Sequence, residues 1–334
     1  EPNYSFYAAG GETASSGAAA AAEQWYAEDI SLPQAWEHLR DSWYSDGGNA
    51  DTVVAVIDTG VDYTHPDLRG AMWVNTGEIP GNGIDDDGNG YADDIYGCST
   101  VSDRTEHSGD PMDDHGHGTH VAGIIGMDPY NGVGGAGVAY GCRIMALKAG
   151  QSSGLFSATD IAEAVSYASM MGADVINMSF VSYADSYLVK EALADAFGTS
   201  VLVASAGNDY IPALPELGGQ NAYPAAYDWV IGVMAYGKGG SFASFSNFDT
   251  WPDSGGEYEI AAPGVDIYST LPGERYGNWA GTSMAAPVVS AAAALLRAKY
   301  SDKTRYSSRY IMGQIVGAAN GTIGVNDPDF QECG

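Results

Sequence analysis

The chain contains 334 residues, of which 45% are hydrophobic, enough for one large core. Lys and Arg number 13 against 43 Asp and Glu, and the formal net charge of −30 argues against nucleic acid as a partner, because phosphate binding depends on basic side chains. The apolar run over residues 290–296 is far shorter than the roughly 18 residues of a membrane-spanning helix, so no membrane span is expected. The acidity has two interpretations: a solvated surface, or calcium binding with adaptation to salty surroundings.

Residues 1–23 differ in composition from the rest of the chain. Residues 8–22 read AAGGETASSGAAAAA, a low-complexity stretch of small side chains that predicts a flexible leader. The chain begins at Glu1 with neither an initiator Met nor a signal segment, so we expect a mature or trimmed form. One ordered domain is predicted over residues 24–334, and its first helix lies near 32–39, where Pro33 suits the first turn.

From residue 52 onward, short β-rich runs alternate with longer helical patterns. Near-continuous apolar runs of this kind are typical of buried parallel strands, so the alternation predicts an α/β fold with a mostly parallel sheet covered by helices on both faces. The predicted strands are 52–58, 143–149, 173–179, 200–206, 229–235 and 257–263, and the predicted helices are 117–127, 159–171, 186–197, 283–299 and 308–318.

Asp58 closes the first predicted strand, in the segment VAVIDTGVDYTHPDL. Active crevices of open parallel sheets lie beyond the carboxyl ends of the strands, and a carboxylate placed there can orient an imidazole. The alternative interpretation is an ordinary turn or capping Asp.

A cluster of histidines follows in the segment DDHGHGTHVAGIIG. His117 stands where a glycine-rich turn enters a helix of small residues, and glycines let its imidazole approach other segments closely. His115 competes for the same role, whereas His120 lies inside the helix and is expected to be a packed structural residue. A metal site is a further alternative, but no Glu or Cys stands at a zinc-like spacing.

Ser283 lies at the predicted start of a long helix of small residues, in the segment GNWAGTSMAAPVV. Backbone N–H groups at a helix start can stabilise a nearby oxyanion, although a Ser at this place is more often an N-cap. Together, Asp58, His117 and Ser283 supply the acid, base and hydroxyl that nucleophilic catalysis requires.

The segments DTGVDYTHPDL, HGHGTHVAG and GTSMAAP resemble the three active-site signatures of the subtilisin-like serine proteases, in the family's chain order of Asp, His, Ser. INMSF and SAGND extend the resemblance, which covers roughly residues 24–320. It implies a three-layer subtilisin-like fold and a secreted, monomeric endopeptidase. Its expected partners are protein or peptide substrates and its own inhibitory pro-segment.

The resemblance also assigns roles to individual residues. Asp58 orients His117, His117 acts as general base and acid, Ser283 is the nucleophile, and Asn208 donates to the oxyanion. Substrate is expected to bind as an extended strand between two segments of the chain, with Ala222 at the pocket floor and Asp209 at its rim. The two segments are Ser152, Ser153, Gly154 on one side and Ser179, Phe180, Val181 on the other. Val181 departs from the family's usual glycine and is expected to narrow the pocket.

The segment GNGIDDDGNGYADD carries a separate metal signal. Its side chains match an EF-hand-like calcium loop, with Gly90 at the sharp turn and Tyr91 offering its carbonyl. The expected ligands are Asp85, Asp87, Asn89, Tyr91 and Asp93, with Asp94 as substitute for the missing terminal Glu. A solvated acidic turn is the alternative. The ion would be structural, and similar loops occur in calcium-binding members of the family.

The three cysteines allow at most one internal disulfide. By the resemblance, the runs that contain Cys98 and Cys142 are neighbours in the sheet, so these two could pair if their Cα atoms lie within about 7 Å. Whether they do is left open, and Cys333 is expected to be a free thiol.

Two other functions are compatible with this fold. A peptide ligase would need to exclude water, and no insertion that could do so is evident. A non-catalytic binding protein is disfavoured because Asp58, His117, Ser283 and Asn208 are all present.

Overall fold

The computed structural model describes residues 5–8, 24–43, 47–101, 108–213, 219–249 and 257–319. Its centre is an eight-stranded sheet with the order β10-β9-β8-β6-β2-β4-β3, in which β11 also pairs with β9. Every pairing is parallel except that of β10 with β9. The strands are β2 (Val53–Asp58), β3 (Gly97–Ser99), β4 (Arg143–Lys148), β6 (Val175–Met178), β8 (Val201–Ser205), β9 (Val230–Gly237), β10 (Ser241–Phe242) and β11 (Ile260–Pro263).

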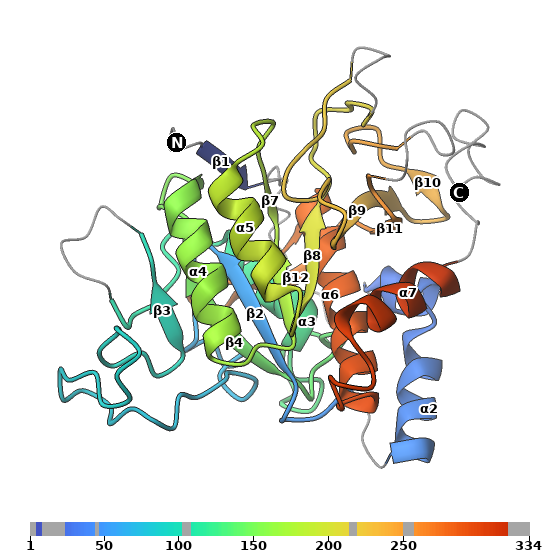
Figure 1. Ribbon diagram of the computed structural model, residues 1–334. Coiled ribbons are helices and arrows are strands. Elements are labelled where there is room, and N and C mark those ends of the chain that lie inside the picture. Colours follow the sequence, from blue (N-terminus) through green and yellow to red (C-terminus); the bar gives the residue numbers. More distant parts are fainter. Residues whose placement is uncertain are drawn as a thin grey trace.

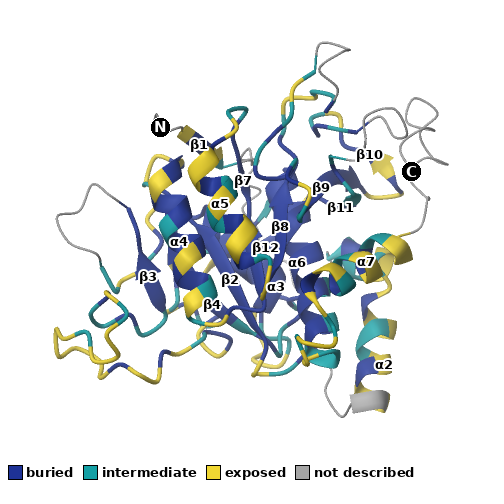
Figure 2. Cartoon of the chain, viewed as in Figure 1, coloured by how far each residue is buried: buried dark blue, intermediate teal, exposed yellow. Residues whose placement is uncertain are grey.

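Helices cover both faces of this sheet, so the predicted three-layer α/β fold is confirmed (Figure 1). Side chains of β2 alternate between two hydrophobic clusters, Val54 and Val56 in one and Ala55 and Ile57 in the other. Figure 2 shows the sheet buried between the helical layers. One cluster includes residues of α3 (His117–Gly126) and α6 (Thr282–Lys299), and the other includes residues of α4 (Ala158–Met170) and α5 (Tyr187–Ala196).

The remaining helices belong to the α3 and α6 side. They are α1 (Trp25–Asp29), α2 (Leu32–Trp43) and α7 (Ser308–Ala318), and Tyr26, Leu39 and Ile311 join the same hydrophobic cluster. All six predicted strands and all six predicted helices are present, with boundaries that differ by a few residues. The sequence did not predict the hairpin of β12 (Ile267–Leu271) and β13 (Arg275–Trp279), which pair antiparallel. Among the described residues, no helix is both long and apolar enough to cross a membrane.

The structure differs from the expected leader at residues 5–8. These residues form β1 (Ser5–Ala8), which pairs antiparallel with β5 (Leu155–Ser157) on one side and β7 (Phe180–Val181) on the other. The composition of 8–22 favoured an unstructured leader, but Phe6 is completely buried in the second hydrophobic cluster. The edges of β5 and β7 offer backbone N–H and C=O groups with which residues 5–8 pair. This pairing and the burial of Phe6 explain why residues 5–8 are ordered. The rest of the predicted leader lies outside the described residues.

Cys98 and Cys142 are both buried free thiols, so they do not form the disulfide that the sequence left possible. Their two runs are indeed neighbours, because β3 pairs with β4. Cys98, however, stands opposite Leu147, and Cys142 precedes that residue by five positions. At about 3.3 Å per residue, this offset separates the two cysteines by about 16 Å along the strand, far beyond disulfide range. Cys333 lies outside the described residues.

Candidate active site

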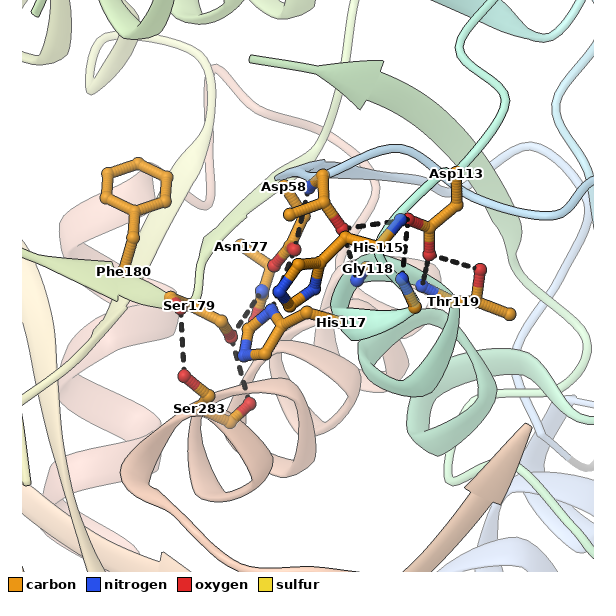
Figure 3. Close-up of polar contacts among 12 residues, drawn as sticks. Asp58, Asp113, His115, His117, Gly118, Thr119, Asn177, Ser179, Phe180 and Ser283 are labelled. Carbon is orange, nitrogen blue, oxygen red and sulfur yellow. Dashed lines mark hydrogen bonds and ion pairs between the residues drawn. The ribbon is translucent and has the colours of Figure 1, made fainter. Parts of the chain in front are cut away.

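Asp58 and His117 form a buried pair at the carboxyl edge of the sheet. Asp58 is the last residue of β2, His117 is the first of α3, and the distance from His117 Nδ1 to Asp58 Oδ1 is 2.7 Å (Figure 3). The same carboxylate oxygen accepts the Thr59 backbone N–H at 2.7 Å. An ionised carboxylate only accepts hydrogen bonds, so Nδ1 carries the imidazole proton and Nε2 keeps its lone pair.

Glycine at position 118 allows this close pairing. A Cβ atom there would lie 2.0 Å from the Gly60 carbonyl oxygen and 2.9 Å from Asp58 Cβ. The first turn of α3 therefore packs directly on the end of β2, which brings the His117 ring to Asp58. The glycines around His117 thus allow its ring to approach another segment of the chain closely, as the sequence indicated.

Ser283 is the second residue of α6 and is buried. Its Oγ donates to the Ser179 carbonyl oxygen at 2.8 Å, and Ser179 Oγ donates back to the Ser283 carbonyl oxygen at 3.0 Å (Figure 3). In the described part of the chain, His117 Nε2 has no hydrogen-bond partner. Asp58 and His117 are thus hydrogen-bonded to each other, whereas the Ser283 hydroxyl is hydrogen-bonded to Ser179. The helices that carry His117 and Ser283, α3 and α6, pack against each other.

Asn208 lies in the loop after β8, and its side-chain oxygen is fixed by the start of α6. Its Oδ1 accepts from both the backbone N–H and the hydroxyl of Thr282, each at 2.9 Å. The Thr282 hydroxyl in turn accepts the Gly207 N–H at 3.1 Å. With Oδ1 engaged, the Asn208 amide offers its NH₂ group as a donor. The sequence reasoning overlooked Thr282, although its place beside Ser283 in GTS was a usable signal.

Asp113 is a second residue that the sequence reasoning overlooked. This buried carboxylate accepts the backbone N–H groups of His115, Gly116 and Thr119 and the hydroxyls of Thr59 and Thr119, at 2.6–3.0 Å (Figure 3). It therefore ties the residue after Asp58 to the turn that carries His117. An Asp whose carboxylate caps N–H groups two and three residues ahead is a known turn pattern, and this was the available signal.

The two histidines near His117 have different surroundings. His120 is completely buried, stacks on Trp279 at 4.8 Å between ring centroids, and contacts the Gly277 carbonyl oxygen through Nε2 at 3.1 Å. Burial lowers the pKa of His120 to about 3, so this ring is neutral over most of the pH range. The predicted structural role of His120 agrees with this packing, whereas His115 is exposed beside the site.

The two segments predicted to flank substrate lie on either side of β1. Gly154 accepts the Ala8 N–H at 3.1 Å, and across the strand Tyr7 stands opposite Val181 and Ala8 opposite Phe180. Ser152 and Ser153 form an exposed turn before β5, and Ser179 precedes β7. Asp209, predicted to lie at the pocket rim, accepts the hydroxyls of Tyr183 at 2.6 Å and Tyr7 at 3.2 Å. Ala222 is buried, and its N–H donates to the Tyr258 hydroxyl at 3.0 Å.

Comparison with known proteins identifies the family. The model of the subtilase family matches residues 49–329, most of the chain. The chain belongs to the subtilase family. It is 40% identical over 256 residues to Thermophilic serine proteinase of Bacillus sp. (strain AK1), which covers 76% of this chain and 54% of that protein. Subtilisin DY of Bacillus licheniformis is 37% identical over 255 residues, 75% of this chain and 78% of its own length.

A third relative is Halolysin-like extracellular serine protease Nep of Natrialba magadii, 34% identical over 256 residues, 76% of this chain and 41% of that protein. This subtilase chain therefore spans only about half the length of some relatives that it matches, 54% of the Bacillus proteinase and 41% of Nep.

In the acidic loop of this subtilase, several of the expected calcium ligands also make hydrogen bonds within the loop. Asp85 accepts the N–H groups of Gly88, Asn89 and Gly90, and Asp93 accepts those of Gly81, Asn82 and Gly83. The Asn89 side chain points its NH₂ group at Asp87 and Asp94, and the Tyr91 hydroxyl donates to Glu163. Asp85 and Asp93 thus also hold the backbone of the loop in shape.

A different set of carboxylates comes together in the described residues. Glu78, Asp87 and Asp94 each place one oxygen within 4.8 Å of the others. This spacing fits a cation with Ca–O distances of about 2.3–2.6 Å to each ligand. Two of the six predicted ligands, Asp87 and Asp94, belong to this group, and Glu78 was missed because it lies outside the loop motif. Glu78 is buried and also accepts the N–H groups of Asp86, Asp87 and Asp93.

Proposed function

We propose that this subtilase is a secreted, monomeric serine endopeptidase that hydrolyses peptide bonds of extended polypeptides through an acyl-enzyme. The observation that carries the proposal is the buried hydrogen bond between Asp58 and His117, which leaves Nε2 as a proton acceptor near the start of α6. Family membership and relatives named as serine proteases support the same function, and the name of Nep supports an extracellular location.

In the acylation step, Ser283 Oγ leaves the Ser179 carbonyl oxygen and attacks the carbonyl carbon of the scissile bond. His117 Nε2 takes the Ser283 proton, and the resulting imidazolium is stabilised by the Asp58 carboxylate 2.7 Å away. When the tetrahedral intermediate collapses, His117 returns the proton to the leaving amine, and the C–N bond breaks. Water then attacks the ester with the same proton transfers in reverse, which releases the carboxylic acid and restores Ser283.

The negative charge of each tetrahedral intermediate requires donors that are already oriented. The Asn208 NH₂ group supplies one, because Thr282 fixes the opposite end of the amide. The Ser283 backbone N–H supplies a second, and it lies in the first turn of α6, where the helix dipole also favours negative charge.

Substrate binding as an added strand is supported by β1 of the chain itself. This segment already lies antiparallel between β5 and β7, with a backbone hydrogen bond to Gly154. An external polypeptide would take its place, so we expect residues 5–8 to compete with substrate as an internal inhibitory segment. Phe6 packs edge-on against Phe180 with ring centroids 5.9 Å apart, which favours an aromatic substrate side chain at that position.

The proposed function is tested by labelling with a fluorophosphonate, which reacts only with an activated serine. We expect one adduct per molecule, located on Ser283 by peptide mapping, together with cleavage of a denatured protein substrate. Prior treatment with the reagent should abolish that cleavage. An unlabelled folded protein, or an adduct on another serine with cleavage intact, would contradict the assignment.

A structural calcium ion is proposed at Glu78, Asp87 and Asp94. Three carboxylates so close together repel one another, and a divalent cation converts this repulsion into attraction. Asp94 is fully buried, and burial raises the pKa of its carboxyl, so a cation there would favour the charged form. The ion would fix the acidic loop against the sheet and would take no part in the reaction.

Removal of calcium is therefore expected to destabilise the fold. Binding to the folded state alone adds about 2.7 kcal/mol at a calcium concentration 100 times Kd, so chelation should lower the melting temperature. The measurement uses Ser283→Ala protein, which cannot digest itself, with calcium and with chelator. Asp87→Ala should remove most of the calcium response. Asp86→Asn, which removes one charge from the same loop outside the carboxylate group, should retain it. Melting curves unaffected by chelator would contradict the site.

A further inference from the structure

Asn247 is a completely buried polar residue that the proposed mechanism does not use. It lies a few residues beyond β10, in the segment SFASFSNF, and its side chain reaches the loop that follows β8. That loop carries Asn208, the proposed oxyanion donor. The two asparagines are far apart in the sequence, so only the fold reveals their relation.

The side chain of Asn247 bonds to the loop on both sides of Asn208. Its Oδ1 accepts the backbone N–H groups of Asp209 at 3.1 Å and Ile211 at 2.9 Å. Its Nδ2 donates to the Ala206 carbonyl oxygen at 2.8 Å. The Asn247 backbone N–H also donates to the Gly207 carbonyl oxygen at 2.8 Å. The backbone immediately before and after Asn208 is thus held by one residue.

The contact between Asn247 and the loop is too close for any side chain at position 207. Gly207 has a φ of +103°, and a Cβ atom there would lie 2.5 Å from Asn247 Nδ2. The loop therefore wraps tightly around the amide, and a displaced amide would move the backbone of Gly207 and Asn208 with it.

An amide is the group that suits this position. One oxygen serves two N–H donors, and one NH₂ group serves the Ala206 carbonyl oxygen and, at 2.9 Å, the Tyr183 hydroxyl. A carboxylate would keep the acceptor but place its second oxygen against the Ala206 carbonyl oxygen. An alanine would leave buried N–H and C=O groups without partners.

We propose that Asn247 is a positioning residue for Asn208. It holds the backbone of the 206–211 loop while Thr282 holds the Asn208 amide oxygen, and together they aim the Asn208 NH₂ group at the oxyanion. The inference rests on the proposed function, because it assumes that Asn208 stabilises an oxyanion. It predicts that loss of Asn247 acts on turnover through Asn208.

The test is a double-mutant cycle measured with a peptide substrate. Asn247→Asp should lower kcat by about 10–100-fold and leave KM within about twofold, because the oxyanion donor acts in the transition state. In an Asn208→Ala background, the same substitution should change kcat by less than about threefold, since its target is already gone. Each kcat is calculated from the concentration of fluorophosphonate-reactive sites, so misfolded protein does not lower the measured value.

A matched control is available at the other end of the molecule. Asn49 is also a loop asparagine whose Oδ1 accepts two backbone N–H groups, those of Asp51 and Thr52, and whose Nδ2 donates to the Ala298 carbonyl oxygen. Asn49→Asp should therefore lower the melting temperature and leave kcat unchanged. Where Asn247→Asp gives no folded protein, Asn247→Ser provides the same comparison.

The outcomes separate this inference from the proposed function. If Asn208→Ala loses turnover but Asn247→Asp causes the same fold-loss in both backgrounds, the positioning role is wrong and Asn208 remains the donor. An effect of Asn247→Asp confined to KM or to melting temperature also overturns the positioning role. If Asn208→Ala itself leaves kcat unchanged, the oxyanion assignment fails first.

Discussion

Replacement of Ser283 by alanine is expected to lower kcat for peptide hydrolysis by about 10⁶-fold, the loss typical of removing the nucleophile from a serine protease. The fold should survive, because the Ser283 hydroxyl makes one hydrogen bond, to the Ser179 carbonyl oxygen, and α6 keeps its reciprocal bond from Ser179 Oγ. The measurement is single-turnover cleavage of a peptide substrate, with the melting temperature as a check on folding.

The matched comparison is His117→Ala, alone and combined with Ser283→Ala. Because the two residues act as one unit, the double variant should be about as inactive as either single variant. Multiplicative losses would show that the serine and the imidazole act independently. Near-normal turnover in Ser283→Ala would mean that another group attacks the substrate.

The sheet and its helices could be predicted from the sequence because the pattern is local. Strands such as β2 are apolar on both faces, as burial between two helical layers requires, and all six predicted strands are present. Asp58, His117 and Ser283 could be singled out for a similar reason, since each stands at a recognisable strand end or helix start.

The parts that escaped prediction depend on contacts between distant segments. Composition favoured a flexible leader, yet Phe6 is buried among residues of β5 and β7, about 150 positions or more along the chain. Glu78 joins Asp87 and Asp94 only through the path of the loop, and no spacing rule includes it. Asn247 has an unremarkable sequence context, and its importance appears only when the 206–211 loop is seen wrapped around it.

Replacement of Asn208 by alanine should lower kcat by about 10²–10³-fold and leave KM almost unchanged. The reason lies in the timing of the interaction. The Asn208 NH₂ group is oriented by Thr282 before substrate arrives, but it gains a charged partner only when the carbonyl oxygen becomes an oxyanion. A loss confined to the transition state therefore appears in kcat and kcat/KM equally.

Asn208→Asp makes the prediction sharper, because it keeps the size of the side chain and the acceptor for Thr282. One carboxylate oxygen can still accept the Thr282 N–H and hydroxyl, but the other faces the developing oxyanion and repels it. We expect Asn208→Asp to lose more turnover than Asn208→Ala, with fluorophosphonate reaction slowed in the same order. Steady-state kinetics of the two variants at a fixed pH measure this. Equal kcat values for both variants and the unsubstituted protein, or losses that appear only in KM, would place Asn208 outside the oxyanion site.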